Sequence, residues 1–208
     1  MKNIYLLSLT KTKYSETIYS PTITINFLEK ELDYSKINTL IFTSKNGVKA
    51  IDKVSKDWKD IPAISVGSKT SEEILKLSGK LLFTSQQFYG KVLTQDIIKN
   101  YSDRKFLYIR PKIVASDIVE VLQNSGIFIQ ETILYETVCR EIKNIRANSI
   151  IIATSPSTVN CLLKKSIPAN SIFIAIGTTT FKAIPNRFQK YIAPHQTIES
   201  CINLAKTI

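Results

Sequence analysis

Short runs of apolar residues recur along the chain, and the stretches between them carry apolar residues at helical spacing. The runs are rich in Ile, Phe and Val and bounded by polar residues, which is typical of buried parallel strands. They cover residues 4–9, 39–43, 63–66, 81–83, 106–109, 150–153 and 171–176. The helical faces between them comprise Val48, Ile51, Val54 and Trp58, then Ile118, Val119 and Leu122, then Val159, Leu162 and Leu163, and finally Ile198, Cys201, Ile202 and Ala205. This alternation predicts right-handed crossover units and parallel sheets.

Two segments depart from this pattern, at residues 22–27 and 127–138. Polar and apolar residues alternate along both, which predicts exposed strands rather than buried ones. Because the two segments occupy equivalent places in the two halves of the chain, we expect them to pair and to join two domains.

One passage occurs twice: a strand ending in Thr-Ser, a helix, a second strand ending in Gly, and a Thr three residues further on. The copies run from Ile41 to Thr70 and from Ile152 to Thr180 with nearly the same internal spacing. They lie about 110 residues apart, which indicates duplication of a whole domain rather than a short tandem repeat. The chain of 208 residues therefore divides into two domains that are each large enough to bury a core.

Local signals mark where helices begin and end. Ser155 followed by Pro156 predicts a helix start, because serine can cap the free amides and proline fits the first helical position. Gly79 and Gly126 follow helical stretches at the position where a left-handed cap is expected.

The composition is that of a globular protein, with 44% hydrophobic and 22% charged residues. Ile4 to Leu9 is too short for a signal peptide or a membrane span, so we expect a cytoplasmic protein. Cys139, Cys161 and Cys201 are odd in number and widely separated, which predicts reduced, buried thiols rather than a disulfide or a zinc site. The single histidine, His195, has no neighbour at ligand spacing, and we expect it to lie in a loop.

A net charge of +11 favours an acidic ligand. Only five of the 28 cations are arginine, and no basic run exceeds two residues. No stripe of aromatic residues interleaves with the cations, as a platform for single-stranded nucleic acid would require.

The repeated motif has two readings. Ser44 and Ser155 at strand ends are suited to cap a helix, which contributes about 1 kcal/mol, but helix starts there also attract anions. Gly67 and Gly177 can relieve a tight turn or let a ligand approach the backbone. Neither glycine belongs to a dinucleotide or nucleoside triphosphate signature.

Further short motifs follow in a fixed order from about Leu40 onward. They are Phe42 to Val48, Val66 to Thr70, Leu107 to Arg110, Gly126, Tyr135 to Thr137, Thr154 to Ser157 and Ile176 to Thr180. Each motif is loose alone, but their order and spacing together resemble the uroporphyrinogen-III synthase family.

The resemblance implies an α/β fold of two doubly wound parallel-sheet domains, flavodoxin-like halves joined by a two-stranded β-ladder. It also implies a substrate cleft between the domains and an N-terminal strand that packs with the C-terminal half. The expected boundaries are residues 1–26 with 138–208 for one domain and 27–132 for the other, with hinge strands at about 22–27 and 131–138.

The activity implied by the resemblance is cyclisation of hydroxymethylbilane, a linear tetrapyrrole, to uroporphyrinogen III with inversion of ring D and loss of water. No cofactor or metal is expected, and no nucleic acid or membrane partner. We expect a monomer, with possible transient handover from the preceding pathway enzyme. The resemblance makes Tyr135 the candidate acid. The candidate substrate-binding residues are Ser44, Asn46, Gly67, Thr70, Arg110, Ser155, Ser157, Gly177, Thr179 and Thr180.

The chain departs from the family pattern in two places. The family usually has an arginine after the first strand and a full helix before the next. Here residues 9–13 contain no arginine, although Lys11 or Lys13 could supply the positive charge. The first helix must be short or absent. Pro111 follows Arg110 where the family commonly has glycine, which predicts a less close backbone approach at that turn.

Two other classes of function compete with this reading. The chain could be a two-domain protein that binds a small anion without catalysis. It could also bind nucleic acid, with an affinity that falls steeply with salt; the scattered lysines make this the weaker alternative.

Overall fold

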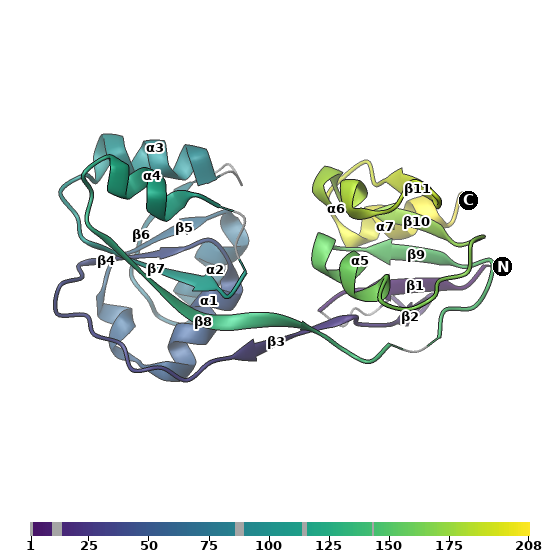
Figure 1. The fold of residues 1–208 in the computed structure, drawn as a ribbon, viewed down its shortest axis with the longest axis horizontal. Coiled ribbons are helices and arrows are strands. Elements are labelled where there is room, and N and C mark those ends of the chain that lie inside the picture. The colour runs from purple at the N-terminus through teal and green to yellow at the C-terminus, as the bar shows by residue number, and fades with distance from the viewer. Residues whose placement is uncertain (1, 10–13, 86–89, 114–115, 143) are drawn as a thin grey trace. The chain divides into compact units, whose positions relative to one another are not determined.

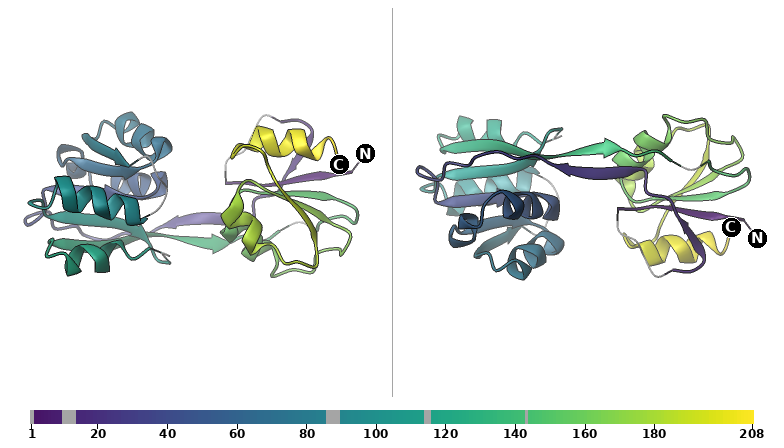
Figure 2. Two further views of the ribbon diagram at one scale, coloured as in Figure 1. Left: turned by 90° about the horizontal axis from the view of Figure 1, so that it is seen from above. Right: turned by 90° about the horizontal axis from the view of Figure 1, so that it is seen from below.

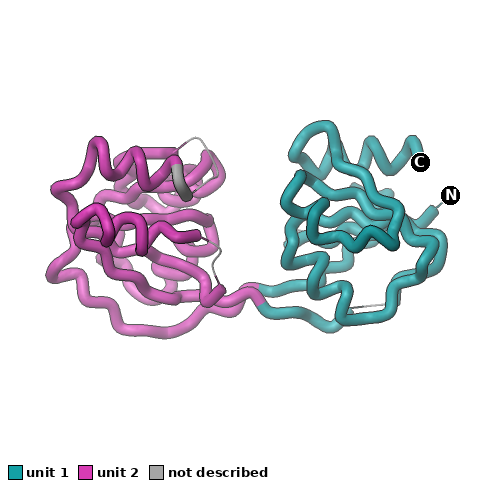
Figure 3. The backbone as a smooth tube through the Cα atoms, turned by 45° about the horizontal axis from the view of Figure 1, so that its top comes forward, with its two compact units in different colours: residues 1–24, 138–208 teal, residues 25–137 magenta. Residues whose placement is uncertain are grey.

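The computed structural model describes residues 2–9, 14–85, 90–113, 116–142 and 144–208. Two compact units comprise residues 1–24 with 138–208 (unit 1) and residues 25–137 (unit 2) (Figure 3). The strands are β1 (Ile4–Leu7), β2 (Thr17–Tyr19), β3 (Ile23–Phe27), β4 (Thr39–Phe42), β5 (Ala63–Val66), β6 (Leu81–Ser85), β7 (Phe106–Pro111), β8 (Ile129–Cys139), β9 (Ile150–Ala153), β10 (Ile172–Ala175) and β11 (Gln189–Ile192). The helices are α1 (Lys45–Val54), the 3-10 helix η1 (Asp57–Asp60), α2 (Ser68–Lys76), α3 (Gly90–Asn100), α4 (Ile118–Asn124), α5 (Pro156–Leu162), α6 (Thr178–Ala183) and α7 (Ile198–Ala205).

Unit 2 is built on a sheet with the strand order β3-β8-β7-β4-β5-β6. The strands β8, β7, β4, β5 and β6 pair with their neighbours in parallel. Helices α1 and α2 cover one face and α3 and α4 the other (Figure 1). The core is accordingly split in two, with Phe42 and Ile51 on the α1 side and Phe106 and Leu122 on the α4 side. The strand order reverses between β4 and β7, where doubly wound sheets bind their ligands.

Unit 1 contains a five-stranded parallel sheet with the order β11-β10-β9-β1-β2. Helix α7 covers one face and α5 the other (Figure 2). Every residue of β1, β9 and β10 is buried, as expected of parallel strands covered on both faces. Numbered within the unit, this is the flavodoxin-like order, with its reversal between β1 and β9. The predicted doubly wound α/β fold is confirmed.

Strands β3 and β8 pair with each other and carry the chain between the units. Leu28 N donates to the Leu134 carbonyl at 2.8 Å, and Arg140 N donates to the Thr22 carbonyl at 2.9 Å. Residue numbers increase along β3 while those of the paired residues in β8 decrease, so the two strands are antiparallel. The prediction of an exposed second strand was wrong for the first part of β8, because this part also pairs with β7 and lies inside the sheet of unit 2.

Trp58 and Gly79 correct two local predictions. Helix α1 ends at Val54, and Trp58 lies in η1, although it is buried in the same core cluster as Val48 and Ile51. Gly126 has the predicted left-handed conformation, with φ of 75°, but beside Gly79 it is Ser78 that has positive φ. A Cβ on Gly79 would lie 2.4 Å from Trp58 Cζ3, so this glycine makes room for the indole ring.

The cysteines correct a third prediction. Cys139 at the end of β8 and Cys161 in α5 form a disulfide, with their Cα atoms 5.3 Å apart. The expectation of three reduced thiols was therefore wrong for this pair, because the fold brings together two residues that lie 22 positions apart. Cys201 is free and buried in α7, and burial raises the pKa of its thiol to about 11.

The segment after β1, where the first helix was predicted to be short or absent, lies only partly within the described residues. Residues 8, 9 and 14–16 contain no helix, and residues 10–13, including Lys11 and Lys13, lie outside the described residues. Strands β2 and β11 lie at the two edges of the sheet of unit 1 and were not predicted. In the part of the chain that the structure describes, no helix is long and apolar enough to cross a membrane.

Candidate functional site

The carboxyl edge of the sheet of unit 2 brings together six of the predicted site residues. They are Ser44, Asn46, Gly67, Thr70, Arg110 and Tyr135. At the reversal of strand order, the Thr43 hydroxyl and the Tyr108 phenol oxygen lie 3.1 Å apart. This contact ties the end of β4 to β7. The first threonine of the repeated motif therefore has a structural role at the point where a ligand is expected.

Ser44 is the N-cap of α1, and its Oγ accepts a hydrogen bond from Asn46 N at 3.2 Å. A serine hydroxyl that accepts one amide proton still has its own proton to donate. Capping therefore leaves this proton free for a second hydrogen bond. Asn46 itself is half-buried in the first turn of α1.

Gly67 is the N-cap of α2 and has φ of 73° with ψ of 152°, a conformation that favours glycine. Thr70 N donates to the Gly67 carbonyl at 3.1 Å. Thr70 is buried, so its side chain contributes to packing at the start of α2. The sharp turn accounts for the glycine without a ligand.

Tyr135 lies in β8 where the register with β7 shifts, and its carbonyl accepts a hydrogen bond from Lys112 N at 2.9 Å. The residue is 4% exposed. Burial raises the pKa of the phenol to about 12, although a hydrogen bond from Ser44 acts in the opposite direction. The phenol is therefore protonated at neutral pH and can act as a proton donor.

Arg110, the predicted charged clamp, is bound to a protein carboxylate. Its Nε and Nη2 donate to the two carboxylate oxygens of Glu131 at 2.8 and 2.7 Å. Nη1 donates to the carbonyls of Pro111 and Lys112 at 3.0 and 3.3 Å. The hydrogen bonds to Glu131 raise the pKa of the guanidinium. Direct contact of Arg110 with a substrate stays a prediction.

Two lysines at this edge were missed in the sequence analysis. Lys45 follows Ser44 in the first turn of α1, and Lys69 lies in the first turn of α2. Neither forms an ion pair with any residue that the structure describes. Their adjacency to the predicted serine and threonine could have identified them as candidate cations for an acidic ligand.

The carboxyl edge of the sheet of unit 1 carries the other five predicted residues, which are Ser155, Ser157, Gly177, Thr179 and Thr180. Ser155 forms a capping box with Thr158, whose N donates to Ser155 Oγ at 3.3 Å. Pro156 follows it, which confirms the predicted helix start. Ser157 is exposed in the first turn of α5.

The second glycine of the repeat differs from the first. Gly177 is the N-cap of α6 and has an extended backbone, with φ of −170°. A Cβ here would lie 3.3 Å from Nε2 of Gln196, an exposed residue in the loop before α7. Thr179 is exposed, whereas Thr180 is buried like its counterpart Thr70. Gln196 is thus a polar group at this edge that the motifs did not reveal.

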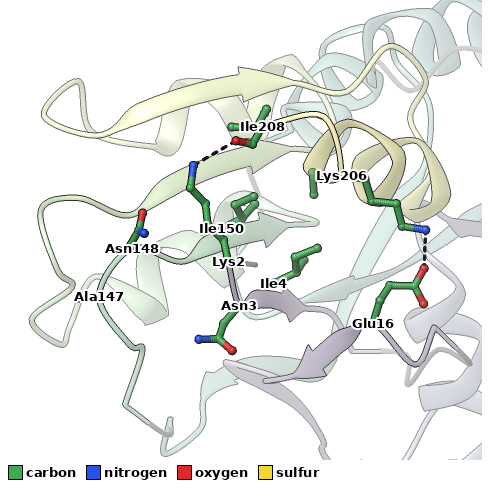
Figure 4. Close-up of a pocket in the computed structure, with 10 residues that line it drawn as sticks. Lys2, Asn3, Ile4, Glu16, Ala147, Asn148, Ile150, Lys206 and Ile208 are labelled. Atoms are coloured by element: carbon green, nitrogen blue, oxygen red, sulfur yellow. Dashed lines mark hydrogen bonds and ion pairs between the residues drawn. The ribbon is translucent and has the colours of Figure 1, made fainter.

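A cavity of about 760 Å³ lies at the other edge of the sheet of unit 1, at the amino ends of β1 and β9 (Figure 4). Its two lysines are engaged. Lys2 Nζ donates to the Ile208 carbonyl at 3.2 Å, and Lys206 forms an ion pair with Glu16 at 2.7 Å. None of the predicted site residues lines this cavity.

The described residues contain no group of three or more His, Cys, Asp and Glu side chains that could hold a metal ion. His195 is exposed in the loop between β11 and α7, as predicted, and its backbone N donates to Ser200 Oγ at 3.1 Å. The groups described at the two carboxyl edges are hydroxyls, a phenol, backbone and side-chain amides, lysines and the guanidinium of Arg110.

Comparison with known proteins gives a consistent picture. The family model described as uroporphyrinogen-III synthase HemD matches residues 10–203. The crystal structure of uroporphyrinogen-III synthetase from Helicobacter pylori is similar with a TM-score of 0.84 and 23% identity, over 100% of this chain and 99% of that one. A mutant uroporphyrinogen III synthase from Thermus thermophilus is similar with a TM-score of 0.62 and 10% identity, over 100% and 98%. At these identities the structures support the fold. No curated protein sequence matches the chain.

Proposed function

The chain belongs to the uroporphyrinogen-III synthase family, and from this membership we propose how its residues carry out the family's reaction. The protein is a cyclising lyase that converts hydroxymethylbilane to uroporphyrinogen III, with inversion of ring D and loss of water. The match of the family model over residues 10–203 is the observation that carries this function.

Substrate carboxylates are bound at the carboxyl edges of both sheets. Ser44 and Ser155 cap their helices through the lone pairs of their oxygens. The hydroxyl proton of Ser155 is therefore available for a carboxylate, whereas that of Ser44 is donated to the phenol of Tyr135. Asn46, Ser157 and Thr179 add exposed or half-exposed polar groups beside them. Lys45 and Lys69 supply positive charge in unit 2, where Arg110 is already paired with Glu131.

Tyr135 acts as the general acid. Its phenol donates a proton to the hydroxyl group that leaves the substrate, which departs as water and leaves a resonance-stabilised cation. The pKa of about 12 keeps the phenol protonated, which makes it a reliable donor but a weak acid. The hydrogen bond with Ser44 stabilises the phenolate formed by this step. A resonance-stabilised cation needs little acid strength, so positioning contributes more than proton transfer.

Buried Thr70 and Thr180 and the N-cap glycines Gly67 and Gly177 shape these edges and set the approach of the substrate to the backbone. We further propose that the protein acts as a monomer in the cytoplasm and receives its substrate by transient handover from the preceding enzyme.

Replacing Tyr135 by Phe tests the proposed acid. We expect turnover of hydroxymethylbilane to fall by about 100-fold or more, the contribution typical of general acid catalysis. Tyr191→Phe is a control, because Tyr191 lies in the edge strand β11 of unit 1. Wild-type turnover in Tyr135→Phe would remove Tyr135 from the mechanism and leave the family membership intact.

A further inference from the structure

The register between β7 and β8 is irregular at the residue that carries the phenol. Arg110 pairs with Ile133, but the next residue, Pro111, pairs with Tyr135, so Leu134 is skipped. Adjacent residues of a regular strand point to opposite faces of the sheet. Leu134 and Tyr135 nevertheless belong to one core cluster. The irregularity therefore determines where the side chain of Tyr135 points, as β-bulges do.

The guanidinium of Arg110 binds both strands at this irregularity. It holds Glu131 of β8 through two hydrogen bonds and the carbonyls of Pro111 and Lys112 through Nη1. Lys112 in turn donates its backbone N–H to the Tyr135 carbonyl at 2.9 Å. A continuous set of hydrogen bonds thus runs from the carboxylate of Glu131 through Arg110 to the backbone of Tyr135.

We propose that Arg110 and Glu131 are positioning residues for Tyr135, and that they hold the shifted register that directs its phenol. This inference rests on the proposed role of Tyr135 as the acid. It replaces the predicted clamp role of Arg110 with an indirect one. The carboxylate of Glu131 neutralises the positive charge of the guanidinium that it binds. The Arg110 side chain is also only 15% exposed, which leaves little surface for a ligand to contact.

The test is a double-mutant cycle that combines Glu131→Gln with Tyr135→Phe. In the wild-type background, we expect Glu131→Gln to lower kcat by about tenfold or more with KM changed less than about twofold, because a displaced catalytic group loses transition-state binding alone. In the Tyr135→Phe background, the same substitution should change kcat by less than about twofold, since the group that it positions is absent.

A second variant keeps the test valid if Glu131→Gln is poorly folded. Arg110→Lys retains the positive charge but cannot bind both carboxylate oxygens and two carbonyls together, so we expect the same loss of kcat. The matched control is Glu136→Gln, which breaks the neighbouring ion pair, 3.0 Å long, between Glu136 of β8 and Lys112, the residue that follows β7. This control should leave kcat and KM at wild-type values.

Three results would overturn the proposal. One is an equal loss of kcat from Glu131→Gln in both backgrounds. Another is a lower KM in Glu131→Gln with kcat unchanged, which would mean that the freed guanidinium binds substrate. The third is wild-type turnover in Tyr135→Phe, which removes the group to be positioned. Failure of the proposed function itself is distinguishable, because the wild-type protein would then form no type III product.

Discussion

A disulfide joins Cys139, the last residue of β8, to Cys161 in α5. It fixes the end of a strand that passes between the units to the helix that Ser155 caps. Both residues belong to unit 1, so the bond restrains this unit in the unfolded chain as well as in the folded one.

Loss of this disulfide should destabilise the protein. A closed loop of this length is expected to contribute about 3 kcal/mol by restricting the unfolded chain. We therefore expect Cys139→Ser combined with Cys161→Ser, or addition of a dithiol reductant, to lower the urea midpoint. Cys201→Ala retains the disulfide, so its midpoint should still respond to the reductant.

The thiol count checks the same bond independently. Protein that is denatured without reductant and then alkylated should gain one label, on Cys201. Three labels, together with a urea midpoint that reductant does not move, would show that Cys139 and Cys161 are reduced, the usual state in the cytoplasm.

The stability of the protein should fall at alkaline pH through Tyr135. Its phenol has a pKa of about 12 when folded and about 10 when unfolded. The stabilisation from keeping the phenol neutral is fully present below pH 10 and is lost as the pH rises through 12, because the unfolded chain then releases the proton first. The loss is about 2–3 kcal/mol.

Urea unfolding of the wild type and of Tyr135→Phe between pH 8 and pH 11 measures this effect, because the other eight tyrosines are common to both proteins. Above about pH 10 the unfolding free energy of the wild type should fall relative to that of Tyr135→Phe. Parallel pH profiles would mean that the phenol is not buried in the folded protein.

Neutralising Lys45 or Lys69 should weaken substrate binding. Each Lys→Gln variant should raise KM by about two- to fivefold, as expected for one exposed charge contact, with a smaller effect on kcat. The increase should diminish at high salt because the interaction is screened. Lys49→Gln is the control, because Lys49 lies in the same helix but faces Glu73 at 3.9 Å. A KM equal to that of the wild type in both variants would exclude these lysines from the binding site.

Much of the fold followed from the sequence because the buried strands are short runs composed mainly of apolar residues. The repeated motif also located both carboxyl edges correctly. In each unit, the first threonine of the motif links the two strands between which the strand order reverses. Thr43 contacts Tyr108 in unit 2, and Thr154 Oγ1 donates to the Leu7 carbonyl at 2.7 Å in unit 1. Serine follows threonine in both copies because Ser44 and Ser155 each cap the helix that comes next.

Other features depend on contacts that no local pattern records. The disulfide forms because β8 ends beside α5, and Gly79 is required by the ring of Trp58. Arg110 was predicted to be a charged clamp because it lies at a strand end, and its pairing with Glu131, 21 residues away on the neighbouring strand, is not recorded in the local sequence. The register shift at Tyr135 likewise depends on the pairing of two strands and not on either sequence alone.

The isomer composition of the product tests the central claim most directly. The wild-type protein is incubated with hydroxymethylbilane, and the products are oxidised and separated by chromatography, with a protein-free reaction to measure spontaneous closure. We predict that the type III isomer predominates with the protein and that type I predominates without it. A product that is only type I in both reactions would contradict the proposed function, and binding of the substrate without isomer control would favour a protein that binds anions without catalysis.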